Sequence, residues 1–554
     1  MRTGDASDGR RHAACGWNFA DTWETLAETL PGEPALLHGD RVVTWADFDA
    51  RADGVAAWLL EAGASEHTSV AQYLTNRPEY LESVFAAFKL GLAPVNTNYR
   101  YVDDELVYLW ENADTSVVVF EGQFAARIEG LRDRVPDVRG WLWVDDGSGP
   151  CPDWATPYED AAASATDRTI APWGRSGDSL FLLYTGGTTG MPKGVMWRND
   201  DLLLVLNEGG PRKRHLPEDV DLDRVRELCA TPGIRTLPAC PLMHGTGAFN
   251  AFTALTGGGS VVTLTGGKFD PVEMLDTVER HAVDNTAIVG DAFARPILAA
   301  LDAEPDRWDI SSLKVILSSG VMWSQATKDG LLRHNPRMLL VDSLGSSEAI
   351  GMANSVSGGD NQSAKTATFT LGPSTKVIAD DHTLIEPGDD RIGKVAMKGH
   401  VPIGYYKDPV KSAETFVQID GESYSMPGDY ARVEPDGTLV LLGRGSVCIN
   451  TGGEKVFPEE VEEALKEHDG VHDAVVVGLP DERFGQAITA VVEPTPGASP
   501  DEDELIGHVK AHHAHYKAPK RIVFVGSLGR AANGKVDYKR WTAHAGDVLG
   551  IAAP

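Results

Sequence analysis

The sequence contains little cysteine. Only five of its 554 residues are cysteines, and none of them form the Cys-x-x-Cys spacing that is typical of zinc and thiol-redox sites. We therefore expect neither a disulfide framework nor a zinc site. The five are Cys15, Cys151, Cys229, Cys240 and Cys448.

Long apolar runs are absent as well. No run approaches the roughly 20 apolar residues that a membrane-spanning helix needs. Residues 1–16 are polar and lack the apolar core of a secretory signal peptide. We therefore expect a disordered N-terminus at 1–16, no transmembrane segment and a cytoplasmic location.

Positive charge is scarce. Lys and Arg number 50 against 81 Asp and Glu, which gives a formal net charge of −31. Nucleic acids and anionic membranes bind basic surfaces, so this balance argues against both as the main partner. Solubility is the simplest reason for the acidity.

Strand-like and helix-like stretches alternate along the chain. Such alternation is typical of α/β architecture with a parallel sheet, and 554 residues are enough for more than one domain. The expected elements include a hairpin of 35–37 with 42–45, a helix from Tyr80 to Leu90, a loop from Pro94 to Asn98, a strand from Ser116 to Phe120, a strand from Met338 to Val341 and a loop from Ile449 to Pro458.

One stretch, Tyr184 to Val195, is rich in glycine, threonine hydroxyls and one lysine. Glycines let backbone N–H groups approach an anion, so the composition indicates a phosphate cradle. Because Met191-Pro192 separates Gly190 from Lys193, it is not a Walker A loop. A plain surface loop is the alternative. The cradle residues are Thr185, Gly186, Gly187, Thr188, Thr189, Gly190 and Lys193.

This stretch resembles the phosphate-binding signature of the AMP-forming acyl-CoA synthetases, the adenylate-forming superfamily, and the resemblance continues from about residue 30 to residue 542. It implies an α/β fold: a large N-terminal domain of α/β subdomains with a small β-barrel region, and a small mobile C-terminal α+β domain. The implied boundaries are 17–444 for the large domain, 445–447 for a hinge centred on Ser446, and 448–554 for the small domain.

Three further motifs carry the catalytic residues that the resemblance implies. In Pro241–Gly247, His244 would orient the substrate carboxylate, although a structural histidine is the alternative. In Asp342–Glu348, Ser347 would contact the α-phosphate and Glu348 would hold Mg²⁺, which prefers oxygen ligands. Near the end, Lys535 would be the catalytic lysine rather than a solvated charge.

The resemblance also implies a nucleotide site and a CoA-side loop. Asp429 would accept from both ribose hydroxyls, because a carboxylate offers acceptors only. Leu344 and Ser446 depart from the family, which has an aromatic residue and Asp or Lys at these places. Losing a stacked aromatic ring would cost about 1–3 kcal/mol. The implied adenine and ribose residues are Gly320, Ser343, Leu344, Gly345, Ser346, Asp429 and Arg444. The CoA-side residues are Gly452, Gly453, Glu454 and Lys455.

The predicted reaction joins a carboxylic acid to ATP, giving acyl-AMP and pyrophosphate, and then passes the acyl group to CoA. ATP, Mg²⁺ and CoA are the implied cofactor and co-substrates. Tyr184–Asp201 and Gly443–Glu460 look most like the actinobacterial branch that acts on fatty and steroid side-chain acids. The pocket-side segments 245–249 and 288–296 are mostly small and apolar, with Arg295 as their only cation, which favours an apolar acid.

Other functions remain open at this stage. An adenylate ligase or an adenylation enzyme that loads a carrier protein would share the first step, as would a luciferase-like oxygenase. A non-catalytic nucleotide-binding regulator is disfavoured, because Lys193, Glu348, Asp429, Arg444 and Lys535 occur together. The sequence leaves a homodimer open and does not give chain length or pathway.

Overall fold

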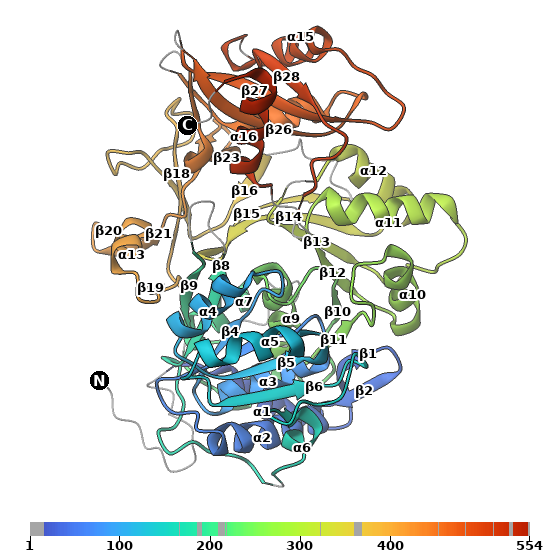
Figure 1. Cartoon of the computed structure of the whole chain (residues 1–554), viewed down its shortest axis with the longest axis vertical. Coiled ribbons are helices and arrows are strands. Elements are labelled where there is room, and N and C mark those ends of the chain that lie inside the picture. The colour runs from blue at the N-terminus through green and yellow to red at the C-terminus, as the bar shows by residue number, and fades with distance from the viewer. Residues whose placement is uncertain are drawn as a thin grey trace. The chain divides into compact units, whose positions relative to one another are not determined.

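The computed structural model describes residues 16–165, 167–185, 191–208, 216–217, 219–321, 323–358, 368–451, 454–481, 484–513, 515–530 and 536–551, with only the backbone at Thr368, Arg444, Ser446, Asn450, Glu454, Lys455 and His512. The chain divides into two compact units (Figure 1). Unit 1 is Met1–Ala364 with Lys398–Ser425, and unit 2 is Lys365–Met397 with Met426–Pro554. Among the described residues, no helix is long and apolar enough to cross a membrane.

The first sheet of unit 1 has the order β19-β9-β8-β4-β3-β5-β6-β7. Its strands from β8 to β7 run parallel, whereas β9 and β19 are antiparallel to their neighbours. The strands are β3 (Ser69–Tyr73), β4 (Ala93–Asn96), β5 (Thr115–Glu121), β6 (Gly140–Val144), β7 (Thr156–Pro157), β8 (Leu180–Thr185), β9 (Lys193–Arg198) and β19 (Gly404–Tyr405).

Helices between residues 19 and 228 pack with this sheet or with one another. Pro78 occupies the first turn of α3, where its missing N–H costs nothing, and Gly91 follows the helix in the left-handed region at φ +68°. The helices are α1 (Phe19–Thr29), α2 (Trp45–Glu61), α3 (Pro78–Lys89), α4 (Asp103–Asn112), η2 (Gly122–Phe124), α5 (Ala125–Leu131), η3 (Arg132–Arg134), α6 (Tyr158–Ala162), α7 (Asn199–Glu208) and α8 (Leu222–Leu228).

Buried ion pairs join α1 to the rest of unit 1. Arg175 lies 2.8 Å from Asp21 and 2.6 Å from Glu24, and Lys89 lies 3.1 Å from Glu24. Burial alone would raise the pKa of Glu24, but Arg175 and Lys89 hold that pKa well below its ordinary value. Removing one partner would leave a buried charge uncompensated, so these contacts fix the position of α1.

The second sheet segment of unit 1 has the order β2-β1-β11-β10-β12-β13-β14-β15 and is parallel from β1 to β14. Its strands are β1 (Pro34–His38), β2 (Arg41–Thr44), β10 (Arg235–Pro238), β11 (Ser260–Thr263), β12 (Asn285–Ile288), β13 (Val315–Ser319), β14 (Leu339–Ser346) and β15 (Ala349–Ser357). Its helices are α9 (Gly245–Thr256), α10 (Pro271–His281), α11 (Asp291–Ala303) and α12 (Gln325–His334).

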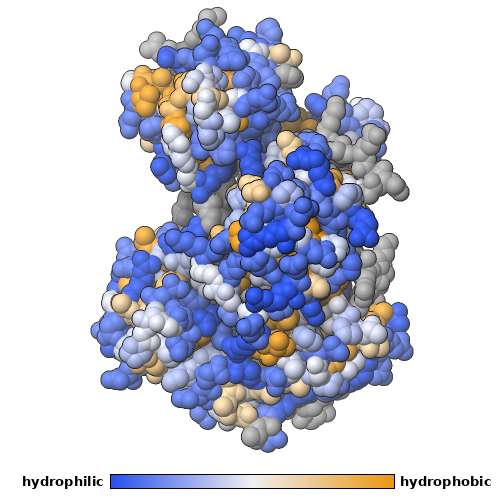
Figure 2. All heavy atoms as spheres, turned by 90° about the vertical axis from the view of Figure 1, so that its right-hand side faces the viewer, coloured by the Kyte–Doolittle hydropathy of each residue, from blue (hydrophilic) through white to orange (hydrophobic). Residues whose placement is uncertain are grey.

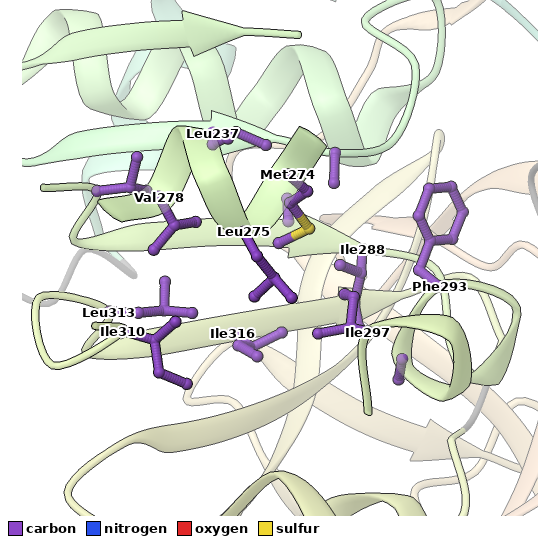
Figure 3. Packing of buried hydrophobic residues seen from close by; sticks show 14 of the residues in the cluster. Leu237, Met274, Leu275, Val278, Ile288, Phe293, Ile297, Ile310, Leu313 and Ile316 are labelled. Carbon is purple, nitrogen blue, oxygen red and sulfur yellow. The ribbon is translucent and has the colours of Figure 1, made fainter. Parts of the chain in front are cut away.

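The core of this segment lies between the sheet and α10 and α11. Asp270 caps α10 by accepting from the Val272 N–H, and the helix buries Leu275 among its apolar residues. Figure 3 shows Leu275 extending from α10 toward Ile316 of β13. Burial of such side chains supplies most of the stabilisation of a helix on a sheet.

The segment 404–425 completes unit 1. It contains β19, the helix α13 (Pro409–Thr415) and the hairpin of β20 (Phe416–Ile419) and β21 (Glu422–Ser425). Asp408 caps α13 by accepting from the Lys411 N–H, and Pro409 fills the first helical position. Backbone pairing of Tyr405 with Val195 joins this segment to β9.

Unit 2 contains two groups of strands. The first comprises β16 (Thr368–Leu371), β17 (Thr375–Ile378), β18 (Gly393–Lys398), β22 (Asp429–Val433) and β23 (Thr438–Arg444). The second is a sheet of β24 (Ile449–Thr451), β25 (Glu454–Val456), β26 (Val471–Asp481), β27 (Gly485–Pro494) and β28 (Arg521–Phe524). The helices are η4 (Gly445–Val447), α14 (Pro458–Lys466), α15 (Glu502–His512), η5 (His515–Lys517) and α16 (Tyr538–Leu549).

Several expected elements are confirmed, among them the hairpin of β1 and β2, the helix α3 and the strand β5. The mixed α/β class is confirmed too. On the face shown in Figure 2, hydrophilic residues predominate and apolar ones form small patches, in line with the high charge of the sequence.

Three expected boundaries are wrong. The predicted loop 94–98 begins as β4, because pairing with β3 and β8 on both sides outweighs the missing N–H of Pro94. The strand expected to end at Val341 continues to Ser346, since β13 and β15 pair with its second half. The predicted loop 449–458 instead contains two short antiparallel strands, β24 and β25. Two glycines between short runs of strand-forming residues are typical of a hairpin, and the prediction of a loop overlooked this signal.

Candidate functional site

The predicted phosphate cradle connects two paired strands. Thr185, the last residue of β8, lies opposite Lys193, the first residue of β9. The residues between them that carry the prediction, Gly186, Gly187, Thr188, Thr189 and Gly190, lie outside the described residues. Both ends of the stretch are therefore held in a hairpin-like register.

Lys193 lies beside a carboxylate. Its Nζ is 3.2 Å from Oδ2 of Asp408 and 5.6 Å from the centre of the Tyr405 ring. The Lys411 N–H, together with Lys193, lowers the pKa of Asp408 although slight burial opposes this. In this structure the charge of the cradle lysine is thus matched by an acid from a segment more than two hundred residues away in sequence.

Glu348 is held by the same segment. The Tyr405 hydroxyl donates to Glu348 Oε1 at 2.8 Å, and Ser425 Oγ donates to the Glu348 carbonyl at 2.7 Å. The Glu348 N–H donates to Ser346 Oγ at 3.1 Å. Tyr405 therefore contacts both Lys193 and Glu348, two of the predicted site residues.

Ser347 lies in the same turn. Its carbonyl accepts from Trp197 Nε1 at 2.9 Å, and Trp197 is a buried residue of β9. This bond connects the turn between β14 and β15 to the strand that follows the cradle. The described residues around Lys193, Ser347 and Glu348 thus form one connected cluster.

His244 occupies the N-cap position of α9 with extended backbone at ψ 150°. Its carbonyl accepts from the Ala248 N–H at 3.0 Å, and its own N–H donates to the Pro241 carbonyl at 3.1 Å. A Cβ at Gly247 would lie 2.4 Å from that Pro241 oxygen. Glycine is therefore required for α9 to begin this close to the turn that carries His244.

Asn96 joins the cradle strand to the His244 turn, and sequence analysis missed it. Its amide nitrogen donates to the Tyr184 carbonyl at 2.8 Å and to the Met243 carbonyl at 2.7 Å, and its oxygen accepts from the Tyr184 N–H at 2.6 Å. The side chain is 2% exposed, so all three bonds are shielded from water. The sequence feature that could have indicated this role is a polar amide side chain at the end of an apolar stretch.

A second asparagine clamps the same turn. Asn76 donates to the carbonyls of Pro238 and Cys240 at 3.1 and 3.0 Å, and it accepts from the Leu242 N–H at 2.7 Å. These bonds satisfy backbone groups at the end of β10 and in the segment that leads from it to α9. The position of His244 is therefore set by side chains from the other sheet of unit 1.

The predicted adenine residues lie at the ends of two neighbouring strands. Ser319 of β13 pairs with Ser343 of β14 in parallel register. Gly320 follows at φ +91°, and a Cβ there would lie 3.8 Å from Val289, so the backbone conformation rather than crowding requires glycine. Leu344 is partly buried and pairs with Ala353. The remaining predicted residues, Gly345 and Ser346, continue β14.

A buried ion pair lies just before this edge, and sequence analysis did not single it out. Lys328 Nζ contacts Asp342 Oδ2, and the Lys328 side chain is 2% exposed. The same ammonium lies 5.6 Å from the centre of the buried Trp323 ring. Burial raises the pKa of Asp342 to about 6, although Lys328 opposes this shift.

In unit 2, the predicted ribose residues are backbone register partners on two neighbouring strands. Asp429, which is 6% exposed, begins β22 and pairs with Arg444 at the end of β23. Ser446 lies in the short helix η4. Glu454 and Lys455 are the first two residues of β25, whereas Gly452, Gly453 and Lys535 lie outside the described residues.

Arg530, five residues before Lys535, has a structural partner. Its guanidinium binds both carboxylate oxygens of Asp473, at 2.5 and 2.8 Å. Burial would lower the pKa of Arg530, but Asp473 holds it above its ordinary value. This pair anchors the start of the segment that leads to Lys535.

The carboxylate of Glu348 suits a metal ion that is also bound by the phosphates of a substrate. In the part of the chain that the structure describes, no group of three or more His, Cys, Asp or Glu residues could hold a metal ion. Mg²⁺ typically binds through one or two carboxylates together with substrate phosphates. A single oriented carboxylate such as that of Glu348 fits this mode and does not fit a dedicated protein cage.

Family models match both parts of the chain. Residues 23–406 match "AMP-binding enzyme" and residues 460–535 match "AMP-binding enzyme C-terminal domain". The first match alone covers more than half of the chain.

Curated relatives match over nearly the whole length. The chain is 39% identical over 536 residues to the medium/long-chain-fatty-acid–CoA/3-oxocholest-4-en-26-oate–CoA ligase of Mycolicibacterium smegmatis, covering 95% of each chain. It is 39% identical over 542 residues to the 3-oxocholest-4-en-26-oate–CoA ligase of Rhodococcus rhodochrous, again covering 95% of each chain.

Solved structures share the fold. The anthranilate CoA ligase AuaEII in complex with anthranoyl-AMP matches with a TM-score of 0.82 at 21% identity, over 97% of this chain and 100% of that one. ATP-bound MatB from Rhodopseudomonas palustris matches with a TM-score of 0.78 at 25% identity, over 96% and 100%.

Proposed function

The chain belongs to the AMP-binding enzyme family, and we propose that it is an AMP-forming acyl-CoA synthetase for apolar carboxylic acids. The carboxylate would attack the α-phosphate of ATP and release pyrophosphate. The CoA thiolate would then attack the acyl-AMP carbonyl and release AMP. The names of its curated relatives describe the ligation of such acids to CoA.

The cluster around Tyr405 is the observation that carries this proposal for unit 1. Negative charge accumulates when one anion attacks another, so preorganised cations and donors must offset it. Lys193 would bind phosphate oxygens together with Thr185 to Gly190, and Ser347 would contact the α-phosphate. Glu348, oriented by the Tyr405 hydroxyl, would hold Mg²⁺ against the phosphates.

The nucleoside and the reacting carboxylate need separate contacts. Gly320 and Ser343 to Ser346 would border adenine, at the carboxyl ends of parallel strands where ligands of α/β sheets bind. Asp429 and Arg444 would bind the ribose hydroxyls. His244, fixed through its turn by Asn76 and Asn96, would orient the substrate carboxylate.

Different residues of the second unit would act in the two steps of the reaction. We assign 17–444 to the large domain, 445–447 to the hinge at Ser446 and 448–554 to the small mobile domain. Lys535 would act in the first step, and the loop with Gly452 to Lys455 would line the CoA path in the second. A Lys535→Ala variant should therefore lose adenylation far more than thioester formation from supplied acyl-AMP. Equal losses would reject this assignment.

The pocket-side segments 245–249 and 288–296 support an apolar substrate. Arg295 is the only cation of the pocket-side segments, and its Nε donates to Asp291 Oδ2 at 3.0 Å. Asp291 lies one turn earlier on the same helix, so the positive charge is already matched within α11. A second carboxylate on the substrate would have no unmatched arginine there. Medium- or long-chain fatty acids and steroid side-chain acids, the substrates in the names of the relatives, satisfy this condition.

Pyrophosphate release tests the proposal. ATP and Mg²⁺ would be supplied with a panel of medium and long fatty acids, steroid side-chain acids, aryl acids, diacids and amino acids, with and without CoA. Release that needs an apolar acid, with AMP and acyl-CoA as products, is the expected result. Acid-dependent release without any thioester would instead indicate an adenylate ligase or a carrier-loading enzyme.

A further inference from the structure

The segment that follows β19 presents a carboxylate to the cradle lysine. Asp408 Oδ2 lies 3.2 Å from Lys193 Nζ, and the two side chains are 34% and 37% exposed. A pair this accessible typically contributes only 0–1 kcal/mol or so to stability. It is therefore weak enough to exchange for another anion.

The position of Asp408 does not depend on Lys193. Its other carboxylate oxygen, Oδ1, accepts from the Lys411 N–H at 3.0 Å and caps α13. The Asp408 carbonyl accepts from Ser412 Oγ, and the same Oγ accepts from the Tyr405 N–H at 2.8 Å. One oxygen thus holds the helix while the other meets the lysine.

The neighbouring cations have partners of their own. Lys407 binds Asp114 at 2.8 Å, and Lys411 binds Glu414 at 2.9 Å. The ion pair of Asp408 is thus formed with Lys193, and Lys411 acts on Asp408 mainly through its N–H.

We propose that Asp408 is a positioning residue that competes with the phosphates of ATP for Lys193. This inference rests on the proposed function, in which Lys193 binds phosphate. Before ATP binds, Asp408 holds the ammonium beside the Tyr405 ring. Phosphate binding replaces the Asp408 contact, and the carboxylate recaptures the lysine when pyrophosphate leaves. The pair therefore lowers affinity for the triphosphate and favours release of the product.

The Asp408→Asn variant removes the competing charge and keeps the helix cap, because asparagine caps as well as aspartate. We expect it to bind ATP with Mg²⁺, and inorganic pyrophosphate with Mg²⁺, about two- to fivefold more tightly than the wild type, the range that a surface pair supports. The gain should shrink at high salt, because exposed charges are screened. Isothermal titration calorimetry of the full chain without any acid substrate measures these affinities directly.

Two further variants separate this effect from a general change of charge. Asp270→Asn removes another helix-capping aspartate of unit 1, on α10, and should leave both affinities unchanged. In a Lys193→Met background, Asp408→Asn should have no effect on affinity, since its partner is gone.

Equal affinities for Asp408→Asn and Asp270→Asn would overturn the inference, as would a gain that persists without Lys193. A wild-type chain that binds no ATP would reject the proposed function itself. ATP binding that Asp408→Asn leaves unchanged would reject only the role of Asp408.

Discussion

Replacing Asn96 with alanine should loosen the cradle strand and the His244 turn together. The substitution removes three buried hydrogen bonds, two to the backbone of Tyr184 and one to the Met243 carbonyl. The backbone groups left behind are shielded from water, and alanine offers no replacement donor or acceptor. The damage should therefore appear in both segments that Asn96 connects.

The magnitude follows from the number of bonds. At about 1 kcal/mol for each bond, the local free energy of opening should fall by about 3 kcal/mol. Because 1.4 kcal/mol or so corresponds to a tenfold change, the amide hydrogens of these segments should exchange about 100-fold faster. Amide exchange is the suitable measurement, because it reports the free energy of opening segment by segment.

Hydrogen exchange followed by mass spectrometry, on peptides that cover 180–185 and 241–247, measures this loss. Asn98→Ala is the matched control, because Asn98 makes an exposed bond to the Arg100 N–H and should change little. Unchanged protection of both peptides in Asn96→Ala would refute the argument that this amide joins them.

Two further predictions concern stability. Leu275→Ala, at a side chain only 1% exposed, should cost about 2–5 kcal/mol in urea denaturation, whereas Val42→Ala, at a half-exposed residue, should cost less than about 0.5 kcal/mol. Because the pKa of Asp342 is raised, the folded state binds more protons than the unfolded state between about pH 4 and pH 6. The contribution of Asp342 to the free energy of unfolding is therefore full below about pH 4 and is lost as the pH rises through about 6. In the wild type, this should change the free energy of unfolding by about 3 kcal/mol between pH 4 and pH 7. The double variant Lys328→Met with Asp342→Asn should lose this pH dependence in denaturation curves. A pH dependence equal to that of the wild type would contradict the raised pKa of Asp342.

Local patterns in the sequence predicted much of the fold. The β1–β2 hairpin and α3 depend on turn residues, capping residues and periodic apolar positions, all of which lie close together in the chain. The end of β14 and the nature of β4 were not predictable in this way. Their extent depends on partner strands that are distant in sequence.

The candidate site likewise contains residues that the sequence could predict and residues that it could not. Lys193 and Glu348 belong to short motifs, so the sequence could select each one and the chemistry that it suits. Their common contact, Tyr405, could not be found, because its bond to Glu348 spans 57 residues and has no local signature. The same applies to Asn96, whose partner Met243 is 147 residues away. Motifs predict the reacting groups, while the residues that position them follow from tertiary structure.

Following heavy oxygen from substrate to product tests the central claim most directly. An apolar acid labelled with heavy oxygen in both carboxylate positions would be supplied with ATP, Mg²⁺ and CoA. If the carboxylate attacks the α-phosphate and the thiolate then cleaves the carbonyl–oxygen bond, the AMP formed should carry one heavy oxygen and the pyrophosphate none. Unlabelled AMP, or label in inorganic phosphate with ADP as the product, would contradict an acyl-adenylate pathway.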